Sequence, residues 1–393
     1  MSKLLLTLIL VGSITLCYAT KFALSGSHDK TVKYWNLSNG ICIKAITEIE
    51  DIYEVAISTD GKFALTCSSD KDANYYSLPD LALIRKLSGH ISGIYGICFS
   101  NDGTHAATGS QDQKAKYWNL EDGNCIYTLD HPSTVSAVDI NNNGKYLLTG
   151  CWDRQLRLFD LQDGTLLRTF TGHTSHITEV RFSSNSKYIL SACQDYTMRY
   201  WDAETGQCLT VIQDTSQVYS AKLSPNGNNI LSGNQWGMVR YWQTDGTRIM
   251  TFSSTHNGAV RGVDIFIDGL YGLSGGDDGY IKYFDITTGN LLLEIKANNI
   301  AVRSVAFNPV EGTGFDTKTS TSCIPYNYFS VTPNPFNTHL TLSLPEEASI
   351  YTITGRLVKK LSKGNYEIDT KTWKSGIYLL KTSTEIRKII KLD

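Results

Sequence analysis

Short runs of alternating apolar and polar residues, separated by polar turns, fill most of this chain. The clearest stretch runs from Ile177 to Asp202 (ITEVRFSSNSKYILSACQDYTMRYWD) and holds three such runs, and a fourth, QCLTVI, follows Gly206. Short runs with Gly, Asn and Asp turns between them are typical of antiparallel strands. No segment outside the N-terminus has a sustained helical period, so the pattern predicts an all-β fold.

The four-run unit repeats at a fixed spacing. An aromatic residue ends the third run seven times, at alternating steps of 41 and 42 residues: Trp35, Tyr76, Trp118, Phe159, Trp201, Trp242 and Phe284. A period of about 40–45 residues with a Gly-His start and a Trp-Asp end is the signature of a four-stranded propeller blade. We therefore predict a seven-bladed β-propeller over residues 20–308.

The first repeat lacks its first strand. The segment that begins at Lys21 starts with a second-strand pattern, whereas AVRSVAF at Ala301–Phe307 matches the inner strands of the other repeats. We expect residues 301–307 to complete the first blade, because closing the ring protects edge strands that an open array would expose.

Four side chains recur at matching places in the repeats. Two repeats carry all four: His90, Thr108, Asp112 and Trp118, and His173, Ser191, Asp195 and Trp201. These repeats resemble the WD40 family, in which the four side chains form a hydrogen-bonded tetrad inside each blade. A His-Ser-Asp set also suggests a nucleophilic triad, but a set that recurs around the ring favours the structural role.

Other repeats depart from this tetrad. The fourth and seventh end in Phe, which lacks the indole donor: His131, Thr149, Asp153 and Phe159, and His256, Ser274, Asp278 and Phe284. In the sixth repeat Trp236 stands where Asp is expected, and the second has no His and carries Tyr76 for Trp. We expect the second and sixth blades to be the least stable.

The N-terminus has the pattern of a secretory signal peptide at residues 1–19. Lys3 precedes an apolar run from Leu4 to Leu16, and small residues lead up to a cleavage site after Ala19. A lipoprotein signal at Cys17 is disfavoured by the bulky Leu16. No other segment is long and apolar enough to span a bilayer.

The composition changes after residue 308. Residues 309–329 are rich in Gly, Thr and Ser and are expected to be a linker, and alternating Leu340, Leu342 and Leu344 open a set of short strand patterns. A small β-sandwich domain is therefore predicted over residues 330–393. An ordinary accessory β-domain would fit this pattern as well.

This last segment resembles the C-terminal sorting domain of the type IX secretion system of Bacteroidetes. The motifs that carry the resemblance contain Pro333, Asn334, Pro335, Gly355, Gly376, Lys388 and Lys391. The resemblance implies recognition by the type IX machinery, passage across the outer membrane, removal of the domain, and release or surface attachment. A membrane contact is expected only through such attachment after export, and the protein is expected to be secreted or at the cell surface.

Charge and cysteine content narrow the function. Thirty-six Lys and Arg against 38 Asp and Glu give a net charge of −2, without the basic bias of a nucleic-acid binder. The nine Cys show no CxxC pair and no zinc-finger spacing, so the sequence indicates neither a metal nor a cofactor, although one disulfide stays open.

Candidate binding residues follow from the resemblance, because WD40 proteins tend to bind partners at the narrow face, where the inner strands start. The positions mapped there are Tyr53, Tyr95, Trp152, Tyr219, Arg261 and Arg303. Tyr, Trp and Arg often anchor interfaces, and Arg suits carboxylate or phosphate. We expect this patch to capture a protein segment or an anionic glycan; alternatively, these residues face solvent or pair with Asp51 and Asp277.

The sequence thus favours an exported, non-enzymatic binding or scaffold protein. An enzyme acting on extracellular glycans would need paired carboxylates at the channel. Glu54 and Glu179 are expected, by strand alternation, to point to the other face. A structural surface or adhesion component is a further alternative.

Overall fold

The computed structural model describes residues 20–253 and 255–311, and the C-terminal ranges 330–332, 339–344, 348–352, 357–362, 364–369, 376–381 and 386–391. The signal-peptide prediction at 1–19 lies outside these residues. Contacts within the chain separate Thr20–Thr313 from a second unit that holds the C-terminal strands. No helix among the described residues is long and apolar enough to cross a membrane.

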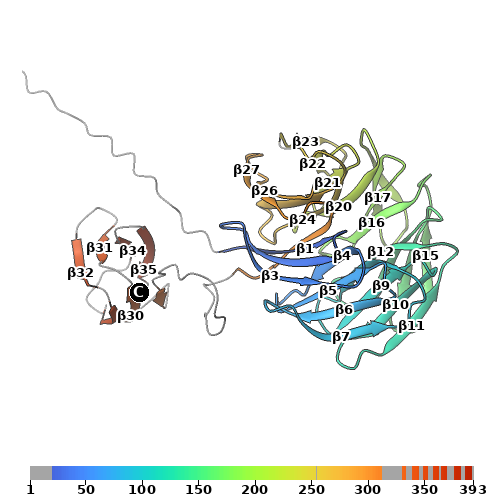
Figure 1. Cartoon of the computed structure of the whole chain (residues 1–393). Helices are drawn as coiled ribbons and strands as arrows, with labels where there is room; N and C mark the ends of the chain where they lie inside the picture. Colours follow the sequence, from blue (N-terminus) through green and yellow to red (C-terminus); the bar gives the residue numbers. More distant parts are fainter. Residues whose placement is uncertain are drawn as a thin grey trace, which may run out of the picture. The chain divides into compact units, whose positions relative to one another are not determined.

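Seven four-stranded antiparallel sheets form the blades of a propeller, which confirms the predicted fold (Figure 1). The inner strands are β28 (Val302–Phe307), β4 (Ile52–Ile57), β8 (Ile94–Phe99), β12 (Val135–Ile140), β16 (Ile177–Phe182), β20 (Val218–Leu223) and β24 (Val260–Ile265). The second strands are β1 (Phe22–Ser27), β5 (Phe63–Ser68), β9 (His105–Ser110), β13 (Tyr146–Cys151), β17 (Tyr188–Cys193), β21 (Asn229–Asn234) and β25 (Tyr271–Gly276).

The remaining strands complete each blade toward the periphery. The third strands are β2 (Thr31–Asn36), β6 (Asp72–Ser77), β10 (Lys114–Asn119), β14 (Leu156–Asp160), β18 (Thr197–Asp202), β22 (Val239–Gln243) and β26 (Tyr280–Asp285). The outer strands are β3 (Ile41–Thr47), β7 (Ala82–Ser88), β11 (Cys125–Asp130), β15 (Leu166–Phe170), β19 (Cys208–Gln213), β23 (Arg248–Thr251) and β27 (Leu291–Lys296).

The first blade joins both ends of the propeller segment. Its strand order is β28-β1-β2-β3, and Leu24 pairs with Ala306 in the antiparallel ladder between β28 and β1. In Figure 1 the blue strand β1 meets the orange end of the propeller. Val310 and Glu311, which fall in the predicted linker, still contact this region, since Glu311 lies 2.6 Å from the Lys21 ammonium.

Burial between neighbouring blades holds the ring together. The second strands are almost wholly buried, whereas most residues of the outer strands are exposed or half-buried. Blade faces meet so closely that a Cβ at Gly150 of β13 would lie 2.6 Å from Ile177 of the next blade. Small residues on the second strands therefore let the branched side chains of the next inner strand pack against them.

Every inner strand contains one extra residue relative to its neighbouring second strand. The residues left unpaired at these bulges are Tyr53, Tyr95, Ser136, Thr178, Tyr219, Arg261 and Arg303. A bulge redirects side chains and interrupts their simple alternation along the strand. This irregularity is what builds the channel described below.

The described ranges of the C-terminal unit form seven strands in two antiparallel sheets. One sheet has the order β29-β30-β33 and the other β32-β31-β34-β35. Their bounds are β29 (Ser330–Thr332), β30 (His339–Leu344), β31 (Ala348–Thr352), β32 (Leu357–Leu361), β33 (Gly364–Asp369), β34 (Gly376–Lys381) and β35 (Ile386–Lys391). Gly376 opens β34 and Lys388 and Lys391 lie in β35, while Pro333, Asn334, Pro335 and Gly355 lie outside the described residues.

Candidate functional site

The seven inner strands surround a central channel with a volume of about 470 Å³. We call the end at which these strands begin the mouth face. The bulged residues Tyr53, Tyr95, Tyr219, Arg261 and Arg303 line the channel there, and so does Trp152 from the turn between β13 and β14. The structure thus brings all six candidate binding residues to one opening.

Five aromatic side chains of the mouth contact one another in sequence, and we call them the aromatic row: His28, Tyr53, Tyr95, Trp152 and His176. Tyr53 stacks on Tyr95 with ring centroids 4.7 Å apart, and Trp152 stacks on His176 at 4.8 Å. Edge contacts join His28 to Tyr53 at 6.4 Å and Tyr95 to Trp152 at 5.6 Å. His176 was missed by the sequence reasoning, because it lies in a loop rather than at a repeat position.

The two candidate arginines differ in their surroundings. Arg261 donates two hydrogen bonds to Asp277, at 2.8 and 2.7 Å, and its guanidinium lies 4.4 Å from the centroid of Tyr219. Arg303 lies 5.7 Å from the centroid of Tyr53 and makes no hydrogen bond or ion pair with any described residue. Burial and the charge of Arg261 both lower the pKa of Arg303. Arg261 therefore already has a carboxylate partner, whereas Arg303 has none among the described residues.

Glu54 and Glu179 line the channel, which contradicts the expectation from strand alternation. Because the bulge inserts one residue, the side chain that follows it also faces the channel. Arg181 of β16 donates to Glu54 of β4 at 2.9 Å and lies 2.7 Å from Glu179. Burial raises the pKa of Glu54, and Arg181 opposes this rise.

The pair between Arg181 and Glu54 crosses the channel. Along the ring, β4 and β16 are separated by β8 and β12 on one side and by β20, β24 and β28 on the other. Their side chains meet inside the channel, so a charged pair spans it below the bulged residues.

Two further carboxylates connect neighbouring inner strands. Asp139 accepts a hydrogen bond from the backbone N–H of Phe182 at 2.7 Å, and Asp264 accepts one from Phe307 at 2.7 Å. Lys222 adds a second cation, 3.9 Å from Glu179. Below the bulged residues, the channel wall thus carries four carboxylates and two cations, all from the inner strands.

The two complete tetrads lie inside their blades. His90 contacts Asp112 through Nδ1 at 2.8 Å and Thr108 through Nε2 at 2.7 Å, and Trp118 donates to Thr108 at 2.8 Å. The corresponding distances for His173 to Asp195, His173 to Ser191 and Trp201 to Ser191 are 2.8, 2.7 and 2.9 Å. Both histidine nitrogens are thereby used in holding strands together.

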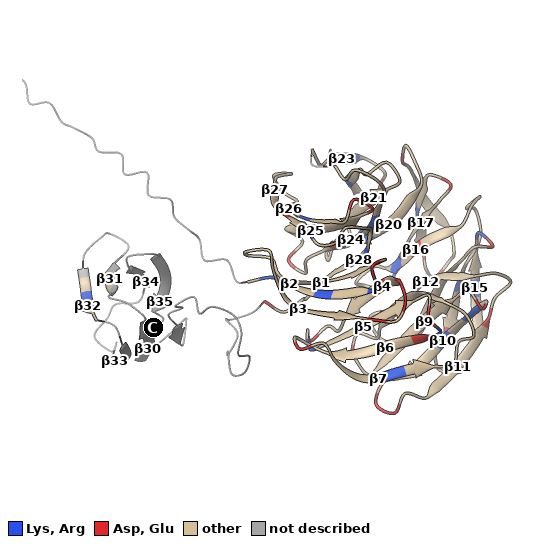
Figure 2. Cartoon of the chain, viewed as in Figure 1, with Lys and Arg blue, Asp and Glu red and all other residues tan. Residues whose placement is uncertain are grey.

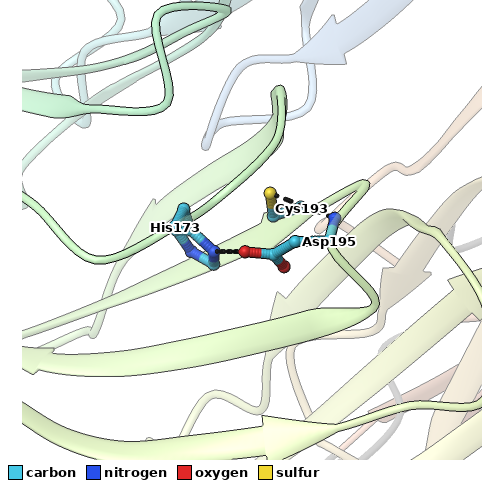
Figure 3. Close-up of side chains that lie close together, drawn as sticks. All are labelled: His173, Cys193 and Asp195. Carbon is cyan, nitrogen blue, oxygen red and sulfur yellow. Dashed lines mark hydrogen bonds and ion pairs between the residues drawn. The ribbon is translucent and has the colours of Figure 1, made fainter.

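Cys193 joins one tetrad and brings three possible metal ligands together (Figure 3). The His173 ring points at Asp195, and the backbone N–H of Asp195 donates to the Cys193 sulfur at 3.3 Å. Burial raises the pKa of Cys193 to about 12, so the thiol stays protonated near neutral pH. Both ring nitrogens of His173 are hydrogen-bonded, one to Asp195 and the other to Ser191, so these contacts hold strands of the fifth blade together.

The fourth blade does not form the predicted contact between His131 and Asp153. Its Asp153 instead accepts hydrogen bonds from Arg157, while His131 contacts Thr149 and the carbonyl of Leu129. Arg157, on the third strand next to the turn, pairs with the Asp153 carboxylate in place of His131. The repeat pattern alone does not reveal this competing cation.

Acidic residues replace the missing histidines in two blades. Glu48 accepts hydrogen bonds from Thr66, Asn74 and Tyr76, and Asp214 accepts them from Asn234 and Arg240. The sequence reasoning missed both acids. Each stands 18 residues before its second-strand Ser or Thr, as His90 does before Thr108, and this offset could have identified them.

Comparison with known families agrees with this architecture. The WD domain, G-beta repeat family matches residues 8–36, 81–119, 123–160, 164–202, 206–243 and 246–285. The secretion system C-terminal sorting domain matches residues 330–392, which implies export by the type IX system to the medium or the cell surface. A search of curated proteins found no match. The chain therefore belongs to the WD40 family, as a seven-bladed propeller that ends in a type IX sorting domain.

Proposed function

We propose that this protein is an exported binding or scaffold protein whose propeller captures a segment of a partner protein at the mouth face. The observation that carries the proposal is the aromatic row, which runs across five consecutive blades at the channel opening. Stacked rings hold one another in place, so little side-chain freedom is lost on binding.

Exposed apolar residues around the same opening support a protein partner. Ile49 and Ile91, in loops leading to inner strands, are 66% and 72% exposed, and Trp236, on the turn between β21 and β22, is 61% exposed. Apolar and aromatic contact area of this kind is typical of protein interfaces. Figure 2 shows acidic and basic residues interspersed over the propeller, which does not favour a polyanionic glycan.

We propose no catalytic role for the channel. Glu54 and Glu179 converge, but both carboxylates contact the same Arg181 nitrogen. A glycosidase needs one carboxyl that donates a proton and one free carboxylate, whereas here both carboxylates are paired with Arg181.

Capture by immobilised protein tests the proposal. We expect Tyr95→Ala with Trp152→Ala to weaken partner binding more than about tenfold, because both rings would anchor the interface. Ile267→Ala with Leu270→Ala, which removes exposed apolar side chains from the opposite face, is the matched control. Proteins from an outer-membrane extract that are captured equally by both variants would contradict the mouth-face proposal. Loss of binding to a sulfated glycan array instead would favour the glycan alternative.

A further inference from the structure

Arg303 is a charged group at the mouth that has no hydrogen-bond or ion-pair partner among the described residues. Its neighbour Arg261 already has a bidentate carboxylate partner in Asp277 and an aromatic face in Tyr219. Arg303 has only the face of Tyr53 and is half-buried at the channel opening. A guanidinium placed there gains most from an anion that approaches in its plane.

The surroundings of Arg303 limit how many negative charges can bind. Below the mouth, Glu54, Asp139, Glu179 and Asp264 outnumber Arg181 and Lys222. At the mouth, Asp277 accepts hydrogen bonds from Arg261. A ligand with several negative charges would meet these carboxylates, whereas one monoanion can reach Arg303 alone.

The adjacent rings define what accompanies the anion. Tyr53 contacts both Arg303 and Tyr95, so a group bound to the guanidinium lies directly beside the aromatic row. A peptide can place a carboxylate on Arg303 and lay apolar or planar side chains along these rings. Because the Glu54–Arg181 pair crosses the channel below, the peptide stops at the mouth.

We propose that Arg303 is a carboxylate-binding residue, and that the captured protein segment presents one acidic group to it, either its C-terminal carboxylate or an Asp or Glu side chain. This proposal rests on the proposed function, since it specifies the ligand of the same site.

Selection from a random peptide display library against the full chain tests it, with the selected peptides synthesised and their affinities measured by fluorescence anisotropy. We expect each binding peptide to depend on one acidic group, so replacing that group by its amide weakens binding about ten- to a hundredfold. Comparing C-terminal amides with Glu→Gln and Asp→Asn peptides shows which source supplies the carboxylate.

Protein variants assign the effect to Arg303. Arg303→Gln should weaken binding by a similar factor and abolish the difference between acid and amide peptides. Arg303→Lys, which keeps the charge but not the planar fork, should keep part of that difference and replaces Arg303→Gln if the latter fails to fold. Arg248→Gln, on the outer strand β23, is the matched control and should bind like the wild type.

The failures are distinguishable. Peptides that bind at the mouth equally well as acid and amide would overturn the role of Arg303 and leave the proposed function standing. Peptides whose binding survives Tyr95→Ala with Trp152→Ala, or a library that yields no binding peptide, would overturn both. Binding only to phosphopeptides would overturn the single-carboxylate ligand.

Discussion

Buried histidines make the stability of the propeller depend on pH. Burial lowers the pKa of His90 and His173, and lowers that of His131 to about 4 from the ordinary 6.5. Hydrogen bonds to both nitrogens of His131 hold the neutral ring in place. Between pH 6.5 and 4, the unfolded chain therefore binds a proton at this position that the folded protein excludes, and stability falls as the pH falls.

We expect His131 to account for a loss of roughly 2–3 kcal/mol in the free energy of unfolding as the pH drops from 7 to 4.5. Urea unfolding of the wild type and of His131→Gln at both pH values measures the contribution of His131 to this loss. The variant should be less stable at pH 7 but should lose less stability on acidification. Equal losses in the two proteins would show that His131 does not carry the effect.

At the scale of the blade, the substituted tetrads leave polar atoms unsatisfied. Asn74 Oδ1 in the second blade, and Asp214 Oδ2, Ser216 Oγ and Arg240 Nε in the sixth, are buried without a hydrogen-bond partner among the described residues. Each such group costs about 1–3 kcal/mol. The acids that replace histidine thus restore part of the network and not all of it.

We expect faster amide exchange in β21 and β22 of the sixth blade than in β17 and β18 of the fifth, which has a complete tetrad and one unpaired buried atom, Arg199 Nε. Local opening is easier where burial leaves polar groups unpaired. Hydrogen–deuterium exchange with peptide-level mass spectrometry measures the difference, and the equivalent strands of the third blade are the internal control. Equal protection in all three blades would contradict the expected weakness.

The blade is also the scale at which sequence reasoning reached its limit. A fixed spacing of aromatic residues sufficed to predict seven blades, because each copy must bury the same faces. Alternation placed Glu54 and Glu179 wrongly, since one bulged residue shifts every side chain after it and no residue type marks the bulge. The ion pair of Arg181 with Glu54 could not be predicted from the sequence either, because its two residues are 127 positions apart and lie in different blades.

At the scale of the whole molecule, the two units have different roles. The sorting domain implies export, and the propeller carries the mouth whose contacts we propose to bind a partner. A carboxylate-binding mouth of this kind would meet its partner outside the cell, in the medium or at the surface. The location of the mature chain is therefore the condition on which the binding proposals depend.

Mass spectrometry of both termini, in culture fluid and in the outer-membrane fraction, tests the central claim of an exported propeller most directly. We expect a chain that starts at Thr20, ends near residue 330 and lies outside the cell, because the signal peptide and the sorting domain would both have been removed. A chain that retains Asp393 and stays inside the cell would contradict export and return the propeller to an intracellular role.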